Sequence, residues 1–199
     1  VNLVRKTREI RKIQNKKRRV KGNYKFIDRK KNSDRLCIIL AGYKQFLWED
    51  VFGRLGKYAP KDIDVCIVSS GLYSEELAKI AEKYDWSYLG VKQNKVSLVQ
   101  NIAINLFENA KLIYKLDEDI FVTKHLFEQL LRTYKEAEKT SPYRVGFVAP
   151  LMPISGYAHV RVLEKTGLIE RFDKRFGKSY HDGDGQAPII KNPDIAKFM

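Results

Sequence analysis

Several signatures of common protein classes are missing from this sequence of 199 residues. No window approaches 18 uninterrupted apolar residues, so we expect no membrane-spanning helix. No basic stretch leads into an apolar segment of the kind found in a secretory signal. The Walker A pattern, the G-x-G-x-x-G pattern and the nucleophile elbow of a Ser-His-Asp site are also absent. The most easily recognised nucleotide-binding and hydrolase motifs are therefore excluded.

Cysteine and histidine are scarce, with two and three residues respectively. Cys37 and Cys66 both lie within apolar runs, RLCIIL and DVCIVSS, so we expect buried thiols rather than a disulfide or a metal-binding pair. Such usage fits a reducing compartment. We therefore expect a cytoplasmic protein, with peripheral attachment to the inner face of the plasma membrane as an option.

Acidic residues are scarce at one end of the chain only. The formal net charge is +14, yet residues 1–35 hold 15 Lys or Arg against three acidic residues, while the remainder holds 23 basic and 21 acidic residues. The positive charge therefore belongs to an N-terminal arm, which we place at residues 1–34. The nearly neutral remainder, 35–199, is expected to be one catalytic domain that continues beyond Met199.

The arm is predicted to form a basic amphipathic helix. Its apolar residues Leu3, Ile10 and Ile13, with Val20 further on, recur at helical spacing in a thin stripe. Such a helix can remain a solvated arm, or residues 1–22 can lie on an anionic membrane surface. It can also contact nucleic acid or a partner protein. Nucleic acid is not favoured, because beyond residue 35 the aromatic residues do not interleave with a basic patch.

After a polar linker near residues 23–34, apolar runs alternate with helical patterns. This alternation predicts an α/β fold with a mostly parallel sheet and helices on both faces. In such sheets, ligands bind beyond the carboxyl ends of the strands, where this chain has small and polar residues. The predicted strands are 35–42, 64–71, 86–91, 111–117 and 144–151, and the predicted helices are a stretch ending near Lys57, 74–84 with Ser74 as its N-cap, 96–110, 125–139 and one beginning at Pro193.

Three consecutive carboxylates end the fourth predicted strand, in the stretch KLIYKLDEDIFV. In an extended segment Asp117 and Asp119 point to one side and Glu118 to the other. Neighbouring carboxylates repel unless a cation lies between them. Mn²⁺ or Mg²⁺ suits oxygen ligands with few protein contacts, and the lack of a His/Cys cluster argues against zinc. The alternative is an acidic turn that caps the next helix.

Residues from about 35 to 151 resemble the nucleotide-sugar half of a GT-A glycosyltransferase, close to the large family 2 group. The resemblance rests on the order of strands and helices, on residues 94–101 before the acidic strand, and above all on LDEDIFV. It implies a GT-A (Rossmann-like) fold. It also implies metal-dependent transfer of a sugar, with inversion, from a nucleotide-diphosphate sugar to a glycan or lipid-linked acceptor. A UDP-sugar is the first donor to consider, and a bacterial-type cell-envelope polysaccharide is one such acceptor.

The resemblance also implies roles for single residues. Asp119 would bind the metal that bridges the diphosphate, and Asp117 would contact the metal through water or the ribose. Two departures from the family pattern lie at the pair Ser69-Ser70, where an acidic residue is usual, and after Asn94, where a glycine is missing. The remaining implied nucleotide-sugar-binding positions are Ala41, Tyr43, Ser69, Ser70, Lys95, Asn101 and Glu118.

A glycine-rich stretch, YHDGDGQAP, offers the catalytic groups that the acidic strand lacks. We expect Asp182 or Asp184 to act as the general base that deprotonates the acceptor hydroxyl, and His181 to contribute a metal ligand. The same loop could instead be a lid over the acceptor or a solvent loop made of turn-forming residues. A base located beyond Met199 is a further alternative.

Two other functions remain open. A nucleotidyltransferase would share the sheet, the metal and the nucleotide, and a Gly-rich loop with Lys or Arg after the first strand would favour it. The stretch AGYKQFLWED has one Gly and one Lys, so this function ranks lower. The other candidate is a non-catalytic, transferase-like module that uses the basic arm to hold RNA, lipid or a partner protein.

Overall fold

The protein is represented by a computed structural model that describes residues 2–150, 158–178 and 193–198. The chain divides into two compact units, residues 1–129 and 130–199. This boundary differs from the expected division between residues 34 and 35. No boundary falls between residues 34 and 35 because residues 24–27, assigned to the arm from the sequence, form part of the sheet of the first unit.

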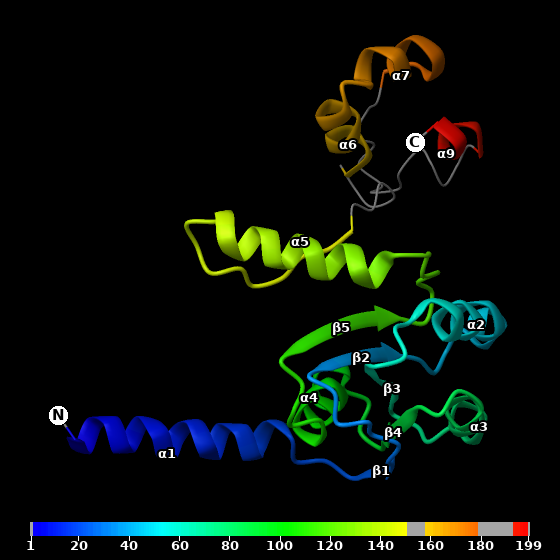
Figure 1. The fold of residues 1–199 in the computed structure, drawn as a ribbon. Coiled ribbons are helices and arrows are strands. Elements are labelled where there is room, and N and C mark those ends of the chain that lie inside the picture. Colours follow the sequence, from blue (N-terminus) through cyan, green and yellow to red (C-terminus); the bar gives the residue numbers. More distant parts are fainter. Residues whose placement is uncertain (1, 151–157, 179–192, 199) are drawn as a thin grey trace. The chain divides into compact units, whose positions relative to one another are not determined.

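The first unit is an α/β fold built on a five-stranded sheet (Figure 1). The two strands at one end of the sheet, β1 and β4, run antiparallel, and the other three pairings are parallel. The predicted mostly parallel sheet is therefore confirmed. In the order of the sheet, the strands are β1 (Tyr24–Ile27), β4 (Ser87–Val91), β3 (Asp64–Ser70), β2 (Arg35–Leu40) and β5 (Leu112–Asp117).

Helices cover both faces of this sheet, as predicted. Every residue of β3 and β4 is buried, which explains their nearly continuous apolar sequences. Along β2, Cys37 and Ile39 pack into the cluster that includes α2 and α3, whereas Leu36 and Ile38 pack into the cluster that includes α4. The helices of this unit are α1 (Asn2–Arg19), α2 (Trp48–Tyr58), α3 (Glu75–Lys83), α4 (Val96–Leu106) and the start of α5 (Leu126–Thr140), with a 3₁₀ turn at Gln45–Leu47.

Two local predictions within the first unit are confirmed. Ser74 is the N-cap of α3, and its Oγ accepts a hydrogen bond from the Leu77 N–H at 3.2 Å. Cys37 and Cys66 are free and buried. Burial raises the pKa of the Cys37 thiol to about 12 and raises the pKa of Cys66 as well.

Two strand predictions were wrong. Tyr24–Ile27, expected to be linker, forms the edge strand β1, whose partly exposed position accommodates the mixed polar and apolar sequence YKFI. Conversely, the strand predicted over 144–151 is not formed by the described residues 144–150, which have no regular structure. Phe147 in this segment is 83% exposed, so the apolar sequence there does not reflect burial.

The second unit contains the rest of α5 and three short helices. Leu163, Phe172 and Ile195 form a small buried cluster, with the rings of Phe176 and Phe198 packed against it. The predicted start of a helix at Pro193 is confirmed. The three short helices are α6 (Ala158–Thr166), α7 (Ile169–Phe176) and α9 (Pro193–Phe198).

Candidate functional site

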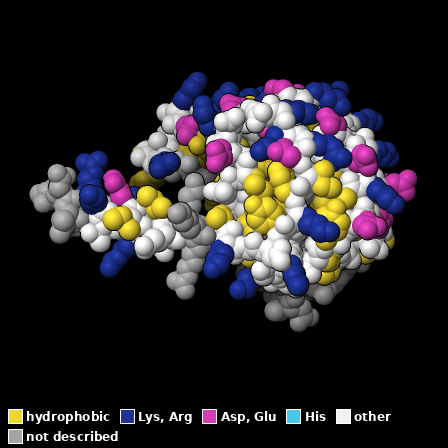
Figure 2. Space-filling view, turned by 90° about the horizontal axis from the view of Figure 1, so that it is seen from below, with side chains coloured by type: hydrophobic (Ala, Val, Ile, Leu, Met, Phe, Trp, Pro, Cys, Tyr) yellow, Lys and Arg dark blue, Asp and Glu magenta, His cyan; other side chains and the backbone are white. Residues whose placement is uncertain are grey.

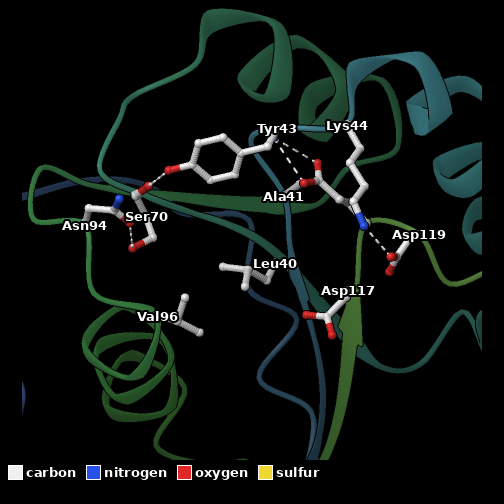
Figure 3. A pocket seen from close by; sticks show the side chains of 10 residues that line it. Leu40, Ala41, Tyr43, Lys44, Ser70, Asn94, Val96, Asp117 and Asp119 are labelled. Atoms are coloured by element: carbon white, nitrogen blue, oxygen red, sulfur yellow. Dashed lines mark hydrogen bonds and ion pairs between the residues drawn. The ribbon is translucent and has the colours of Figure 1, made fainter. Parts of the chain in front are cut away.

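A pocket of about 230 Å³ lies at the carboxyl edge of the parallel strands (Figure 3). The strand order places β3 and β4 on one side of β2 and places β5 on the other side. Ligands of open α/β sheets bind where the strand order reverses in this way, because the connecting segments diverge there and leave a crevice. The residues lining the pocket are Leu40, Ala41, Tyr43, Lys44, Ser70, Asn94, Val96, Asp117, Glu118 and Asp119.

Asp117 and Asp119 both line this pocket, but not for the reason given by strand alternation. The strand β5 ends at Asp117. Its carbonyl then accepts a hydrogen bond from the Ile120 N–H at 3.1 Å, so residues 117–120 form a turn. The assumption of an extended segment through residue 119 was therefore wrong. The two carboxylates are nevertheless brought to one pocket, by the turn.

Glu118 has a structural role that the sequence did not indicate. Its buried carboxylate accepts hydrogen bonds from the Gly42 N–H at 2.9 Å, the Tyr43 N–H at 3.1 Å and the Trp48 indole N–H at 2.7 Å. Burial alone would raise the pKa of Glu118, but these donors outweigh it and the pKa lies below its ordinary value. The carboxylate thereby fastens the loop after β2 to the turn after β5.

Each of the other two carboxylates has a lysine partner. Lys44 Nζ forms an ion pair with Asp119, and Lys115 Nζ lies 2.6 Å from both carboxylate oxygens of Asp117. The hydrogen bond from Lys44 lowers the pKa of Asp119 and outweighs the opposing effect of burial. All four side chains are between two-fifths and half exposed. Exposed ion pairs of this kind contribute little to stability, so another cation can replace the lysines.

The opposite end of the pocket is formed by neutral polar groups (Figure 3). The Tyr43 hydroxyl donates to the Ser70 carbonyl at 3.0 Å, so the tyrosine ring spans from the loop after β2 to the end of β3. The Ser70 hydroxyl lies 3.4 Å from Asn94 Oδ1. Gly71, with φ of +87°, allows Asn94 to come this close, since a Cβ at Gly71 would lie 2.9 Å from Asn94 Cβ.

Several residues expected at the site do not line the pocket. Ser69 is fully buried, with its hydroxyl donating to the Leu72 carbonyl at 2.8 Å and paired with the Tyr88 hydroxyl at 2.7 Å. Lys95 and Asn101 do not line the pocket either. The residues on either side of Lys95 in the sequence, Asn94 and Val96, do line it. The remaining expected residues, His181, Asp182 and Asp184, lie outside the described residues.

The sequence reasoning missed Lys44 as a pocket residue. Its position directly after Tyr43, in the loop that follows the first parallel strand, was the available signal. Leu40 and Val96, which also line the pocket, carried no signal beyond their apolar character.

The donor set of the pocket fits Mn²⁺ or Mg²⁺. Asp117 and Asp119 supply hard oxygen donors, and such ions need few protein ligands because water and phosphate oxygens complete their coordination. Within residues 2–150, 158–178 and 193–198, no group of three or more His, Cys, Asp or Glu side chains is arranged to hold a metal ion, so these two aspartates would be the protein's own ligands.

A second surface feature is helix α1, which appears at the left of Figure 2 with Lys and Arg side chains around a small hydrophobic group. Residues 5–15 are all exposed, including Ile10 at 47% and Ile13 at 57%. The predicted basic helix is confirmed. Among the described helices, none combines the length and the apolar character that crossing a membrane requires.

Comparisons of the chain with protein-family models, with curated proteins and with solved structures find no match.

Proposed function

We propose that the pocket between β2 and β5 binds a nucleotide-diphosphate sugar, and that the protein is a metal-dependent GT-A-type glycosyltransferase. One observation carries this proposal, namely that Asp117 and Asp119 line one pocket at the point where the strand order reverses. The donor would be a UDP-sugar in the first instance, and the acceptor a glycan or a lipid-linked sugar. The lack of a spanning helix in the described part of the chain is compatible with a cytoplasmic enzyme.

The two ends of the pocket suit the two ends of a nucleotide diphosphate. At the acidic end, Asp119 and Asp117 would hold Mn²⁺ or Mg²⁺, which as a Lewis acid neutralises charge on the departing diphosphate. At the other end, Ser70 and Asn94 offer a hydroxyl and an amide to a base or ribose. The Tyr43 ring, 66% exposed, offers a face on which a base can stack.

Transfer with inversion requires one general base to remove the proton of the acceptor hydroxyl. We propose Asp182 or Asp184 for this role, with His181 as an additional metal ligand. Substitution of the true base by Asn would abolish sugar transfer and leave nucleotide binding unchanged, because the base contacts the acceptor rather than the donor.

Calorimetric titration of UDP tests the proposal, with Mn²⁺ present and then with EDTA, on the wild type and on Asp119→Ala. Binding that requires Mn²⁺ and is lost in Asp119→Ala supports a metal-bridged diphosphate. GDP, CDP and dTDP follow if UDP does not bind. No binding of any of the four contradicts the transferase and leaves the non-catalytic module as the better description.

Lys44 favours a second candidate, a nucleotidyltransferase, because a lysine in the loop after the first parallel strand can contact the phosphates of a nucleoside triphosphate. Product analysis separates the two reactions. A nucleotidyltransferase releases pyrophosphate from UTP and a sugar phosphate, whereas a glycosyltransferase releases UDP from a UDP-sugar.

A further inference from the structure

Lys44 is held over the pocket by the buried carboxylate of Glu118. The N–H groups of Gly42 and Tyr43, the two residues before Lys44, both donate to Glu118. The Lys44 carbonyl accepts a hydrogen bond from the Leu47 N–H at 2.9 Å, which closes the turn on the other side. The backbone at Lys44 is therefore fixed on both sides. The long side chain, 44% exposed, remains free to change partners.

The Lys44 side chain is a positive charge in a pocket whose other charged side chains are negative. Among the ten lining residues, three are carboxylates and Lys44 alone is positively charged. An incoming diphosphate would be repelled by the carboxylates unless positive charge accompanies it. Lys44 neutralises Asp119 in the absence of ligand, yet the same carboxylate is the proposed metal ligand. Lys44 and a divalent cation therefore compete for one group.

We infer that Lys44 exchanges partners when the donor binds: it leaves Asp119 to the metal ion and pairs with the diphosphate of the nucleotide sugar. This inference rests on the proposed function and assigns to Lys44 the role of a diphosphate-binding residue. The exchange conserves the number of ion pairs at Lys44, because one carboxylate partner is replaced by a phosphate oxygen. It also links metal binding to diphosphate binding. A metal ion on Asp119 releases Lys44 for the diphosphate, and a diphosphate on Lys44 releases Asp119 for the metal ion.

Lys44→Met tests the inference, because methionine retains the apolar stem without the charge. In the absence of nucleotide, the variant should bind Mn²⁺ about two- to fivefold more tightly, since an exposed ion pair no longer competes for Asp119. With Mn²⁺ saturating, it should bind UDP about 10- to 100-fold more weakly, because a charge-assisted hydrogen bond to phosphate is lost. Mn²⁺ binding is followed by electron paramagnetic resonance and UDP binding by calorimetry.

Lys115→Met is the matched control. Lys115 pairs with Asp117 but does not line the pocket, so its substitution should leave the UDP affinity of the Mn²⁺-loaded protein unchanged. Uridine, which lacks phosphate, is the ligand control, and Lys44→Met should not change its affinity. Lys44→Arg should retain most of the UDP affinity because it keeps the charge.

Different outcomes identify which idea fails. If the wild type binds none of the four nucleoside diphosphates with Mn²⁺, the proposed function is wrong and the inference falls with it. If the wild type binds UDP and Asp119→Ala abolishes binding, but Lys44→Met binds UDP normally, the inference alone is overturned. Weakened binding of both Mn²⁺ and UDP in a folded Lys44→Met variant would also overturn it, because that result indicates a structural role for the side chain.

Discussion

At the scale of single residues, three adjacent carboxylates have three different sets of partners. Asp117 pairs with Lys115, Asp119 pairs with Lys44, and Glu118 is buried among hydrogen-bond donors of the loop after β2. The turn after β5 produces this separation, since it directs the Glu118 carboxylate to N–H groups of the loop after β2, while Asp117 and Asp119 pair with lysines. The middle carboxylate therefore supports the structure on which the other two depend.

Substitution of Glu118 tests this structural role. Glu118→Gln keeps the shape of the side chain but removes its charge. The NH₂ group of glutamine is a hydrogen-bond donor and would face the N–H donors that the carboxylate now accepts from. We expect the free energy of unfolding to fall by about 1.5–3 kcal/mol at neutral pH, as is typical when hydrogen bonds to a buried charged group are lost. Urea unfolding followed by tryptophan fluorescence measures the change. A loss smaller than about 0.5 kcal/mol, the size expected of a surface substitution, would contradict the role.

Because the pKa of Glu118 is lowered, the difference in stability between the wild type and Glu118→Gln should depend on pH. Its folded value lies below the ordinary value of 4.5, so the ionised carboxylate stabilises the folded state fully above the ordinary value. The stabilisation is lost as the pH falls through the lowered folded value, where the carboxylate takes up a proton. The difference in stability between the wild type and Glu118→Gln should therefore shrink below about pH 4.5 and stay constant above pH 6.

The sequence predicted the residues of the site unevenly, and the causes are physical. Asp117 could be predicted from the sequence because it ends the apolar run that forms β5. The roles of Glu118 and Lys44 depend on contacts across 70 or more positions of the chain, which local patterns do not encode. Asn94 was passed over for Lys95 because the close approach at Gly71, which sets the position of Asn94, is a tertiary feature.

At the scale of elements, helix α2 contains two glycines in very different surroundings. A Cβ at Gly53 would meet nothing within 4 Å, whereas a Cβ at Gly56 would lie 2.5 Å from the Tyr84 ring. Tyr84 cannot easily retreat, because its ring stacks on Trp86 at a centroid distance of 4.6 Å. The helix therefore needs glycine at one of the two positions only.

We expect the two Gly→Ala variants to have opposite effects. Gly53→Ala should stabilise the protein by about 0.5–1 kcal/mol, because alanine favours the helix more than glycine does. Gly56→Ala should destabilise it by about 1–3 kcal/mol, because the added methyl group forces Tyr84 or the helix to move. Thermal or urea unfolding of both variants measures the difference, and a shift of the same sign in both would contradict the packing of α2 on Tyr84.

Helix α1 is the element for which we propose contact with an anionic membrane surface. Its lysines and arginines would bind anionic headgroups, and Ile10 and Ile13 would enter the interface. The double variant Ile10→Ser, Ile13→Ser should bind anionic vesicles about tenfold more weakly with all charges retained, because the apolar contribution is lost. Cosedimentation with anionic and zwitterionic vesicles measures this.

Two results would argue against the membrane surface. Equal binding of the wild type and the double variant would show that the isoleucines do not enter the interface. Tighter binding to RNA than to vesicles, with a steep salt dependence, would favour nucleic acid instead.

The strand predictions also succeeded or failed according to burial. Strands β2, β3 and β4 were found because burial on both faces produces apolar runs that stand out in the sequence. Strand β5 was found from its apolar sequence, although Leu116 alone among its six residues is buried. Strand β1 was missed because an edge strand with partly exposed residues has a mixed sequence, and residues 144–150 were wrongly assigned because an apolar sequence does not require pairing.

At the scale of the whole molecule, the two units should unfold as separate transitions. The first unit has a two-sided core around the sheet, whereas the second has a small cluster around Phe172. Under the proposed function, UDP with Mn²⁺ at about 100 times the dissociation constant should stabilise the first unit by about 2.7 kcal/mol and leave the second unchanged. Scanning calorimetry measures both. A single transition that shifts as a whole would show that the units unfold together.

The pairing of β1 with β4 has a consequence for the order of events during protein synthesis. Tyr24 pairs with Val91, so the edge strand leaves the ribosome long before its partner. At about 5–20 residues per second, β1 waits on the order of several seconds with its backbone groups unpaired. The basic helix α1 that precedes it has also left the ribosome by then. Repulsion between the positively charged helices of neighbouring nascent chains would keep those chains apart while the strand is unpaired.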